Sequence, residues 1–596
     1  MPIKFASSEV ALETRTDGVV LLRSKRPLMP YPDRLGDMLY RSASRAPQRT
    51  FLAEKKDGGW SELTYEEALK KAESLAQYLI DRGLGQSTPL MLLSGNSIDH
   101  ALMTLAGILA GVPVAPVSPA YSLMSQKHVT LRALFSLLQP PIIFADRPNI
   151  FQPALSSLDL KGVTLISSQP AAPNSDAVHI QDIFESEASP AVRERNESIG
   201  PSSVAKYLFT SGSTGRPKGV ITTHGMLCAN QQMISQVWPF LKESPPVLID
   251  WLPWHHCFGG NHNFNLAMNH AGTLHIDGGK PVGELFSETL ANLCQVSPTI
   301  YFNVPAGFSL LIPQLRENAR LRKAFFKRLK MVMFAGAALP EELWKQLKSL
   351  AAESCDQPPL MATGWGSTET APLATAVHSP VDNARSIGLP APGVEIKLLP
   401  SGGKQELRVR GPNVTPGYLG RPGLTRQAFD EEGFFKIGDS GFLADPNDPS
   451  KGIVFNGRIA EDFKLATGTW VNVNRVRLNI LSLAGQLLAD AVVTGADRQF
   501  LGLLAWPGKD WPREDQWRRQ PEFMEQLCLK LRQYNDAHPG SSTRIRRVIL
   551  LSDPPSMDRG EITDKAYVNQ RAVLDNRCSA VDILYEDPPG SQVVVV

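Results

Sequence analysis

Apolar residues recur at helical spacing over residues 64–83, TYEEALKKAESLAQYLIDRG. Thr64 stands before the run and Glu67 follows three residues later, which predicts a capping box at the start of a helix. Gly83 is typical of a helix end. One face of this helix is apolar and would pack on a core; it consists of Ala68, Leu69, Ala72, Leu75, Ala76 and Leu79.

Short apolar runs then alternate with helical segments. PLMLLS (89–94) and VPVAPV (112–117) flank an apolar helix near 98–109. The alternation continues to about residue 351, and it predicts a parallel sheet covered by helices on both faces. We therefore expect an α/β fold with a large N-terminal domain of stacked α/β sheets, spanning residues 1–457.

The pattern of apolar and polar residues changes after about residue 385. VEIKLLPSGGKQELRVRGPNV shows short alternating strands with Gly/Pro turns, which predicts a small β unit at about 385–457. Residues 458–596 are more charged and are predicted to form a smaller, mobile α+β domain. SQPAAPNSD (168–176) has the composition of a loop or linker, and the final QVVVV is interpreted as a frayed tail.

Composition narrows the function classes. The 596 residues carry a net charge of +2, so strong attraction to nucleic acid or to an anionic membrane is not expected. The most apolar stretch, 101–117, is interrupted by Gly and Pro, which favours a buried helix and strand over a membrane span. No apolar signal-peptide region opens the chain, and the six cysteines are scattered, so we expect a cytoplasmic protein with reduced thiols.

The strongest chemical signal is VAKYLFTSGSTGRPKGV (204–220). An apolar strand enters a loop rich in Gly, Ser and Thr, where backbone N–H groups and hydroxyls can surround an anion and a lysine adds charge. The pattern suits a polyphosphate, although it lacks the Walker A spacing. The candidate phosphate ligands are Thr210, Ser211, Gly212, Ser213, Thr214, Gly215 and Lys218.

This loop resembles the phosphate loop of the adenylate-forming superfamily of acyl-CoA synthetases, adenylation domains and luciferases. Five further stretches resemble that family's motifs in the same order, over roughly residues 30–570. They are LPWHHCFG (252–259), AGAALP (335–340), GWGSTET (364–370), IGDSG (437–441) and NGRIAEDFKLATG (456–468). The resemblance implies an enzyme that uses ATP and Mg²⁺ to adenylate a carboxylic acid. It then transfers the acyl group to coenzyme A and releases AMP and pyrophosphate.

The resemblance and the chemistry together assign roles to single residues. A carboxylate is a poor electrophile, so the reaction needs groups that hold phosphates, a metal and a cation near the reacting oxygens. Glu369 suits Mg²⁺, a hard cation that prefers carboxylate oxygen. The resemblance places His256 at a gate and Gly336 and Ala337 in the nucleotide and acyl pocket. The remaining nucleotide candidates are Trp365 for adenine, Gly366 beside it, Thr368 for the α-phosphate, and Asp439 and Arg458 for the ribose.

Two lysines are candidates for opposite steps. By resemblance, Lys464 stands six residues after Arg458 and faces the site only after the small domain has rotated about a hinge near 458–461, so it serves thioester formation. The family's adenylation lysine usually follows a glycine, but Glu561 occupies that place here. Lys565, four residues further on, either replaces it or is a surface charge; the catalytic role is favoured because a lysine stem is flexible.

The substrate is narrowed by resemblance alone. FKLATGTWV (463–471) resembles the hinge-side spacing of long-chain acyl-CoA synthetases, whereas GEITDKAYVNQRAVL (560–574) resembles bacterial feruloyl-CoA synthetases. The first hypothesis is a hydroxycinnamic acid such as ferulate. The alternatives are a medium- or long-chain fatty acid, loading of a carrier protein, and a non-catalytic sensor. A flat acyl pocket could be lined by Trp254, Phe258, Phe264, Tyr301, Phe302 and Gly336.

Five histidines fall within residues 255–275, namely His255, His256, His262, His270 and His275. Their spacing matches no compact zinc site, and no cysteine or acidic cluster accompanies them. A role for His256 at the gate is favoured over a metal centre, with the other four in loops or core. The small-molecule partners expected are therefore a carboxylic acid, ATP and coenzyme A, without nucleic acid or stable membrane insertion.

Overall fold

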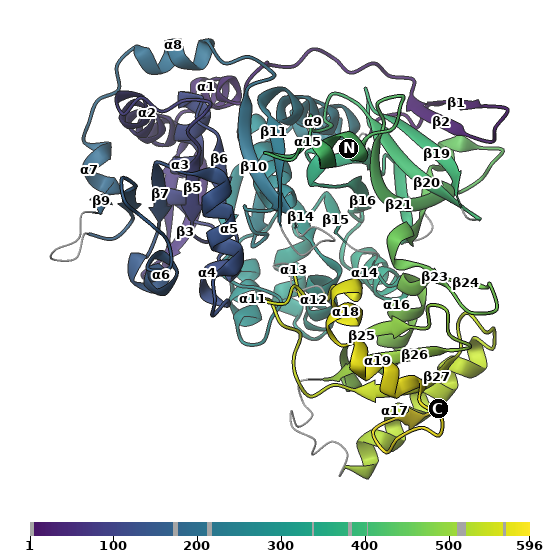
Figure 1. Cartoon of the computed structure of the whole chain (residues 1–596). Helices are drawn as coiled ribbons and strands as arrows, with labels where there is room; N and C mark the ends of the chain where they lie inside the picture. Colours follow the sequence, from purple (N-terminus) through teal and green to yellow (C-terminus); the bar gives the residue numbers. More distant parts are fainter. Residues whose placement is uncertain are drawn as a thin grey trace.

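Figure 1 shows the computed structural model, which describes residues 5–170, 177–210, 217–336, 339–379, 384–401, 403–508, 520–563 and 568–596. A seven-stranded sheet lies in the N-terminal half, and all its strands except β11 run parallel to their neighbours. Its order is β11 (Lys218–Thr223), β10 (Val204–Thr210), β6 (Val114–Pro116), β5 (Leu90–Leu93), β7 (Ile142–Ala145), β8 (Thr164–Ser167) and β9 (Val178–His179).

The predicted amphipathic helix is present as α2 (Tyr65–Asp81). Thr64 Oγ1 accepts from the Glu67 amide, and the Glu67 carboxylate accepts from the Thr64 amide at 2.9 Å, so the capping box is confirmed. Helix α3 (Ile98–Ala110) follows β5, and all its residues except Asp99 are buried. An apolar helix buried on every side explains the long apolar run. Among the described residues, we find no helix long and apolar enough to span a membrane.

A second, four-stranded sheet packs into the same core. Its strands are β12 (Val247–Asp250), β13 (Thr273–Ile276), β3 (Thr50–Lys56) and β4 (Gly59–Thr64). Helix α9 (His224–Val237) is buried along most of its length, and its core residues join the cluster that contains α3, β5 and β12. Sheets with helices between and around them confirm the predicted α/β class.

The third sheet has eleven strands and combines two parts of the chain. Parallel strands β14, β15 and β16 continue through antiparallel strands into the β-rich unit at the upper right of Figure 1. The N-terminal strands β1 and β2 also pair with this unit, which the sequence pattern did not predict. Its order is β1 (Val10–Thr14), β2 (Val20–Ser24), β19 (Glu395–Ser401), β20 (Lys404–Arg410), β21 (Phe435–Leu443), β22 (Ile453–Arg458), β18 (Ser386–Pro390), β17 (Leu373–Ala376), β16 (Leu360–Gly366), β15 (Met331–Phe334) and β14 (Ile300–Asn303).

The C-terminal part has its own sheets and core, as expected for a smaller α+β domain. A two-stranded ribbon, β23 (Phe463–Lys464) and β24 (Trp470–Val471), precedes a four-stranded sheet. The sheet consists of β25 (Leu488–Thr494), β26 (Leu501–Pro507), β27 (Ile545–Leu550) and β28 (Val594–Val595). Its helices are α16 (Val473–Ala484), α17 (Pro521–Ala537), α18 (Gln570–Asn576) and α19 (Cys578–Tyr585).

The other helices of the large part connect or cover these sheets. They are α1 (Gly36–Arg45), α4 (Ala120–Leu123), α5 (Val129–Leu138), α6 (Pro148–Leu155), α7 (Ile180–Phe184), α8 (Ala191–Glu197), α10 (Phe264–Asn269), α11 (Leu285–Gln295), α12 (Pro305–Glu317), α13 (Ala319–Phe326), α14 (Glu341–Ser354) and α15 (Pro422–Ala428).

Two expectations about loops and tails need comment. The predicted linker 168–176 connects β8 to β9 of one sheet, so it does not separate domains; residues 171–176 lie outside the described residues. The frayed tail was a wrong prediction, because β28 pairs with β27 and the Val596 amide donates to the Arg546 carbonyl at 3.0 Å. Val594 and Val596 pack on the C-terminal core, which gives the apolar tail a place to bury its side chains.

The connection between the two parts is short and charged. Strand β22 ends at Arg458, and the turn η5 (Ile459–Glu461) leads into β23. Across this turn, the Lys404 ammonium of β20 forms an ion pair with the Asp462 carboxylate. The predicted boundary between residues 457 and 458 falls at the last residue of β22, just before one set of sheets gives way to the next, and it stays a prediction as a domain limit.

Deletion of residues 592–596 should destabilise the C-terminal part. Three of the five residues are partly buried valines, so the loss should be about 2 kcal/mol. Differential scanning calorimetry measures this as a lower Tm for the transition of the C-terminal part. An unchanged transition would mean that β28 contributes nothing to that core.

Candidate functional site

The hairpin β10–β11 closes the predicted phosphate loop. Thr210 at the end of β10 lies opposite Lys218 at the start of β11, so the two ends of the loop are held together. The candidates Ser211, Gly212, Ser213, Thr214 and Gly215 between them lie outside the described residues. The Lys218 ammonium lies 5.2 Å from the ring centroid of Tyr418.

Tyr418 connects this hairpin with Glu369. Its hydroxyl donates to Glu369 Oε1 at 3.0 Å, and its backbone forms a bridge with Val220 of β11. Burial raises the pKa of the Tyr418 phenol, and the neighbouring Glu369 carboxylate raises it further, so the phenol stays protonated as a donor. One tyrosine therefore links the candidate phosphate lysine to the candidate metal ligand.

Glu369 lies in a turn, η3 (Thr368–Thr370), directly after β16. Gly366 before it has φ +157°, and a Cβ there would stand 1.8 Å from the Pro372 carbonyl oxygen, so the close approach requires glycine. The Thr415 amide donates to the Glu369 carbonyl at 2.8 Å. These contacts fix the backbone that carries Thr368 and Glu369.

The segment 252–259 meets the same turn. Cys257 Sγ lies 3.6 Å from Thr368 Oγ1, both buried, so the structure brings the predicted gate segment to the GSTET turn. His256 precedes Cys257 and is 9% exposed, and its ring lies 4.3 Å from that of His255. His256 thus lies one residue from a contact with Thr368.

The predicted adenosine residues also come together. Trp365 Nε1 donates to Asp439 Oδ2 at 2.8 Å, and Arg458 Nε lies 3.4 Å from Asp439 Oδ1. Asp439 and Arg458 are cross-strand partners in β21 and β22. Burial raises the pKa of the Asp439 carboxyl, although Arg458 and the Trp365 bond partly oppose this. Oδ1 accepts no hydrogen bond from the described residues, which leaves an acceptor beside the indole.

Gly336 follows β15, next to the carboxyl end of β16. Its φ is +86°, a conformation that favours glycine, and Val304 Cγ1 would be 3.8 Å from an added Cβ. Ala337 lies outside the described residues. Gly336 therefore lies beside the strand that leads into the GSTET turn, and its role in the nucleotide and acyl pocket stays a prediction.

The predicted acyl-pocket residues divide into three groups. Phe258 and Phe302 contact each other edge to face at 6.0 Å, and His262 packs against both. Tyr301 is on the other face of β14, against Phe308 and Phe325 in a different core cluster. Neighbouring strand residues point to opposite faces, so Tyr301 cannot share a wall with Phe302.

The third group lies near α3. Trp254 packs on His100 and Phe264, with ring centroids 5.5 Å and 5.1 Å away. Among the described residues, no ring contact joins Trp254 or Phe264 to Phe302, although all three belong to one core cluster. His262 takes their place beside Phe258, and the sequence offered no signal for it beyond its spacing of four residues, one helical turn, from Phe258.

The C-terminal candidates are placed differently. Lys464 is exposed in β23, with its ammonium 5.0 Å from the ring centroid of Trp470. Lys565 lies outside the described residues. Glu561, at the position where the sequence resemblance expects the adenylation lysine, is fully buried, and its carboxylate accepts from Arg577 at 2.7 Å and 3.0 Å. The Ser556 amide donates to the same carboxylate at 2.9 Å.

Glu561 is therefore a structural acid. Burial by itself raises the pKa of its carboxyl, but the bonds from Arg577 and the Ser556 amide outweigh burial and lower the pKa below the usual value. The loop that contains Glu561 also touches the large part, where Ser125 Oγ donates to Asp558 Oδ1 at 2.6 Å. Lys565 follows this loop four residues later in the sequence.

The clustered histidines do not converge. His270 Nε2 lies 3.0 Å from Ser235 Oγ, and His275 Nδ1 lies 3.3 Å from the Leu248 carbonyl. Within the described ranges, no group of three or more His, Cys, Asp or Glu side chains is placed to hold a metal ion. Burial lowers the pKa of His262 and of His270 to about 4, so both are neutral at pH 7.

Comparison with known families decides the classification. The AMP-binding enzyme family matches residues 39–419, and the AMP-binding enzyme C-terminal domain matches residues 464–588. The chain belongs to the AMP-binding enzyme family. The motifs that resembled adenylate-forming enzymes, from the phosphate loop to the GSTET turn, lie within the first match.

Individual relatives of this AMP-binding enzyme are distant. A long-chain-fatty-acid–[acyl-carrier-protein] ligase of Arabidopsis thaliana, AEE15, is 22% identical over 476 residues, covering 66% of this chain and 63% of the relative. The 4-coumarate–CoA ligase-like protein 9 of the same plant is 26% identical over 415 residues, covering 65% and 66%. The chain spans only 40–63% of the length of the first three curated relatives it matches.

A solved structure supports the fold. The anthranilate CoA ligase AuaEII, in complex with anthranoyl-AMP, superposes with a TM-score of 0.71 at 17% identity, covering 93% of this chain and 99% of that one. The likeness shows that both parts of this AMP-binding enzyme have the family's architecture, a large N-terminal domain and a smaller C-terminal domain.

Glu561→Gln should destabilise the C-terminal part of this AMP-binding enzyme. Loss of a charged acceptor that is buried with Arg577 costs about 1–3 kcal/mol at pH 7. In the wild type, the stabilisation by the lowered pKa is present above about pH 4 and is lost as the pH falls through the folded pKa. The difference in Tm between wild type and variant should therefore shrink below pH 4. A variant as stable as the wild type at pH 7 would contradict the structural role.

Proposed function

We propose that this AMP-binding enzyme is an ATP-dependent acid:CoA ligase, located in the cytoplasm. The carboxylate of the acid attacks the α-phosphorus of ATP, and pyrophosphate leaves. The coenzyme A thiol then attacks the acyl carbon of the adenylate, loses its proton, and AMP leaves. The observation that carries the proposal is the meeting of Lys218, Tyr418, Glu369 and Thr368 beside Trp365 and Asp439.

The chemistry of these residues matches the adenine, the ribose and the phosphates of ATP. The indole of Trp365 offers a flat face to adenine, and its N–H holds Asp439 through Oδ2. The other oxygen, Oδ1, accepts no hydrogen bond from the described residues and can accept from a ribose hydroxyl. Lys218 and the loop it closes suit the phosphates. Thr368 Oγ1 can donate to the α-phosphate, in the turn that also carries Glu369.

Mg²⁺ fits the donor set at Glu369. The ion commonly binds through one or two carboxylates together with substrate phosphates and retained waters. Glu369 is a half-buried carboxylate, and Tyr418 orients it with a single neutral hydrogen bond, without a competing cation within salt-bridge distance among the described residues. We propose that Glu369 holds the ion, which neutralises phosphate charge when bound.

The acid is proposed to be aromatic, with ferulate or another hydroxycinnamate as the first candidate. The edge-to-face group of Phe258, His262 and Phe302 favours a flat ring. The relative named as 4-coumarate–CoA ligase-like agrees with this choice. The second candidate function is activation of a fatty acid and its transfer to a carrier protein. It is favoured by the relative named as a long-chain-fatty-acid–[acyl-carrier-protein] ligase.

A panel assay tests the function and separates the candidates. Purified protein, ATP and Mg²⁺ are given ferulate, 4-coumarate, benzoate, hexanoate or palmitate, and pyrophosphate release is measured. Coenzyme A and a phosphopantetheinylated acyl carrier protein are then compared as acceptors. The proposal expects acid-dependent pyrophosphate and a CoA thioester of a hydroxycinnamate; no pyrophosphate with any acid would favour a sensor.

Glu369→Gln should lower the rate of pyrophosphate release by roughly 10²–10³ while the protein stays folded, because it removes a charged ligand at the triphosphate. Tyr418→Phe is the matched variant. It removes one hydrogen bond to Glu369 and should raise the Mg²⁺ concentration for half-maximal rate about tenfold. Rates of both variants that match the wild type at limiting Mg²⁺ would contradict the metal role.

Lys565→Ala and Lys464→Ala should fail in opposite half-reactions. We expect Lys565→Ala to lose adenylation and still convert supplied acyl adenylate and coenzyme A to thioester. Lys464→Ala should form adenylate and fail in the second step, because Lys464 is exposed beside Trp470 here and would reach the site only after rotation about Ile459–Glu461. The reverse pattern would exchange the two assignments, and full activity of Lys565→Ala would make it a surface charge.

A further inference from the structure

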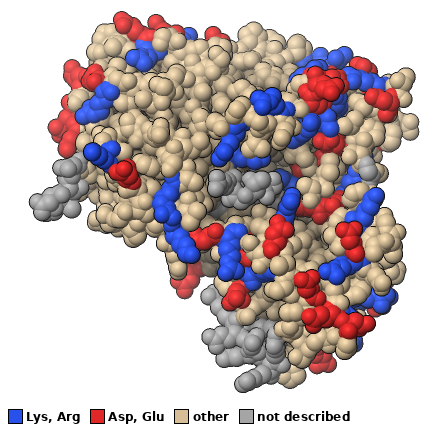
Figure 2. All heavy atoms as spheres, in the orientation of Figure 1, with Lys and Arg blue, Asp and Glu red and all other residues tan. Residues whose placement is uncertain are grey.

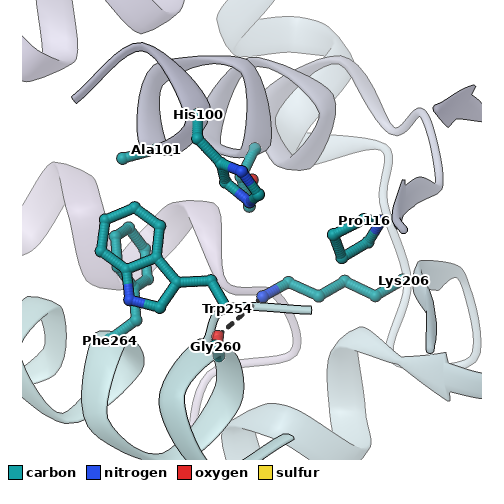
Figure 3. Close-up of a pocket in the computed structure, with 8 residues that line it drawn as sticks. His100, Ala101, Pro116, Lys206, Trp254, Gly260 and Phe264 are labelled. Carbon is teal, nitrogen blue, oxygen red and sulfur yellow. Dashed lines mark hydrogen bonds between the residues drawn. The ribbon is translucent and has the colours of Figure 1, made fainter. Parts of the chain in front are cut away.

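Lys206 is a lysine of β10 that is almost completely buried, with 2% of its surface exposed. Figure 3 shows its side chain running along a small cavity of about 10 Å³ toward the Gly260 carbonyl, with His100 and Trp254 nearby. The ammonium donates to that carbonyl at 2.8 Å and lies 3.3 Å from Asn261 Oδ1. No acid forms an ion pair with it in the part of the chain that the structure describes.

The acceptor of this bond lies in an unusual helix. The segment η2 (Phe258–Asn263) is a π-helix, a form that is often found at functional sites and costs regular hydrogen bonds. The Lys206 ammonium donates a hydrogen bond to the Gly260 carbonyl. Gln231 Nε2 of α9 donates to the Asn261 and His262 carbonyls at 3.1 Å and 3.3 Å. Side chains of two other elements thus cap three successive carbonyls.

The backbone of η2 is also wedged against the preceding segment. A Cβ at Gly259 would stand 2.3 Å from the Leu252 carbonyl oxygen, and one at Gly260 would stand 2.1 Å from the Trp254 carbonyl oxygen. Only glycine permits this approach. The position of η2 is therefore set from one side by backbone contact and from the other by the caps of Lys206 and Gln231.

The π-helix carries the residues proposed to contact the acid. Phe258 and His262 project from it toward Phe302, and Cys257, just before it, reaches Thr368. Four residues after Lys206, β10 ends at Thr210 and enters the phosphate loop. Lys206 thus connects two segments: the strand that leads into the phosphate loop, and the π-helix that carries the proposed acid-binding residues.

We propose that Lys206 is a positioning residue for acid binding, which acts by capping the Gly260 carbonyl of the π-helix and so fixing Phe258 and His262. The inference rests on the proposed function. Lys206 touches neither the acid nor ATP in this account; its effect reaches the acid through the helix.

The hydrogen bond, rather than the charge, is the necessary property. Burial lowers the pKa of Lys206 to about 7, and a neutral amine still donates to a carbonyl. The titratable groups near it are His100 of α3 and His224 of α9, and burial lowers the pKa of each to about 3, so both are neutral. Methionine has a similar length and fills the space, but it cannot donate.

Lys206→Met is the test, with two readouts. Hydrogen–deuterium exchange of the peptide spanning residues 256–265 should increase, because one cap of η2 is lost. The KM for the acid, measured with ferulate, 4-coumarate and palmitate, should rise about tenfold while the KM for ATP changes less than twofold. Tyr207→Phe is the matched control: its side chain lies on the other face of β10, in a separate core, and should leave both readouts unchanged.

The outcomes are separable. If wild-type protein releases no pyrophosphate with any of these acids, the proposed function is wrong. If wild type is active and Lys206→Met keeps its exchange and its KM for the acid, the inference is wrong and the function stands. If Lys206→Met does not fold, Gln231→Leu decides by the same two readouts, because it removes the other caps of η2. Equal rises in both KM values would also overturn a role specific to the acid.

Discussion

The hydrogen bond from Tyr418 to Glu369 is the contact on which the rest of the site depends. Tyr418 belongs to the loop before α15, Glu369 to the turn after β16, and the Lys218 ammonium lies over the tyrosine ring at the end of the phosphate loop. The Tyr418 side chain therefore contacts two segments that are far from it in the sequence, one through Glu369 and one through Lys218. Without this contact, a carboxylate and a lysine suited to the same triphosphate would lack a common anchor.

Around this contact, the arrangement of the sheets determines which candidate residues lie close together. Strands β14, β15 and β16 are parallel, so the segments that leave their carboxyl ends lie along one edge, and Gly336 and the GSTET turn are two of them. The β-rich unit continues the same sheet and brings Asp439 to Trp365. The C-terminal part follows through the short turn η5 and contacts the large part where Ser125 Oγ donates to Asp558 Oδ1. In Figure 2, Lys and Arg side chains are interspersed with Asp and Glu over the face shown, which agrees with recognition by particular residues rather than by a broad field.

Sequence patterns predicted the local features that depend on neighbouring residues. The capping box at Thr64, the buried helix α3, and the order of strands and helices follow from periodicity and caps. The patterns missed pairings between distant segments. Strand β2 pairs with β19, whose residues come more than 370 positions later, and β28 completes a sheet that a frayed tail would have left open. Strand partners cannot be read from a single strand, because alternation specifies a face and not a neighbour.

The candidate site shows the same division. Family motifs indicated Glu369, Trp365, Asp439 and Lys218, which the structure brings together in two connected groups. Tyr418 and Cys257 were missed because their partners are distant in the sequence: Tyr418 contacts Glu369 across 49 residues, and Cys257 contacts Thr368 across 111 residues. Tyr301 was grouped with Phe302 because they are adjacent in sequence, and adjacency in a strand places two side chains on opposite faces. The roles of the lysines at 464 and 565 stay predictions.

The central claim is that an acid is activated by attachment to AMP, and isotope transfer tests it most directly. Ferulate labelled with ¹⁸O in both carboxylate oxygens is incubated with the protein, ATP, Mg²⁺ and coenzyme A, and the products are examined by mass spectrometry. Attack of the carboxylate on the α-phosphorus predicts that one ¹⁸O appears in AMP and none in pyrophosphate. Label in inorganic phosphate together with ADP would show attack on the γ-phosphorus through an acyl phosphate and would contradict the account.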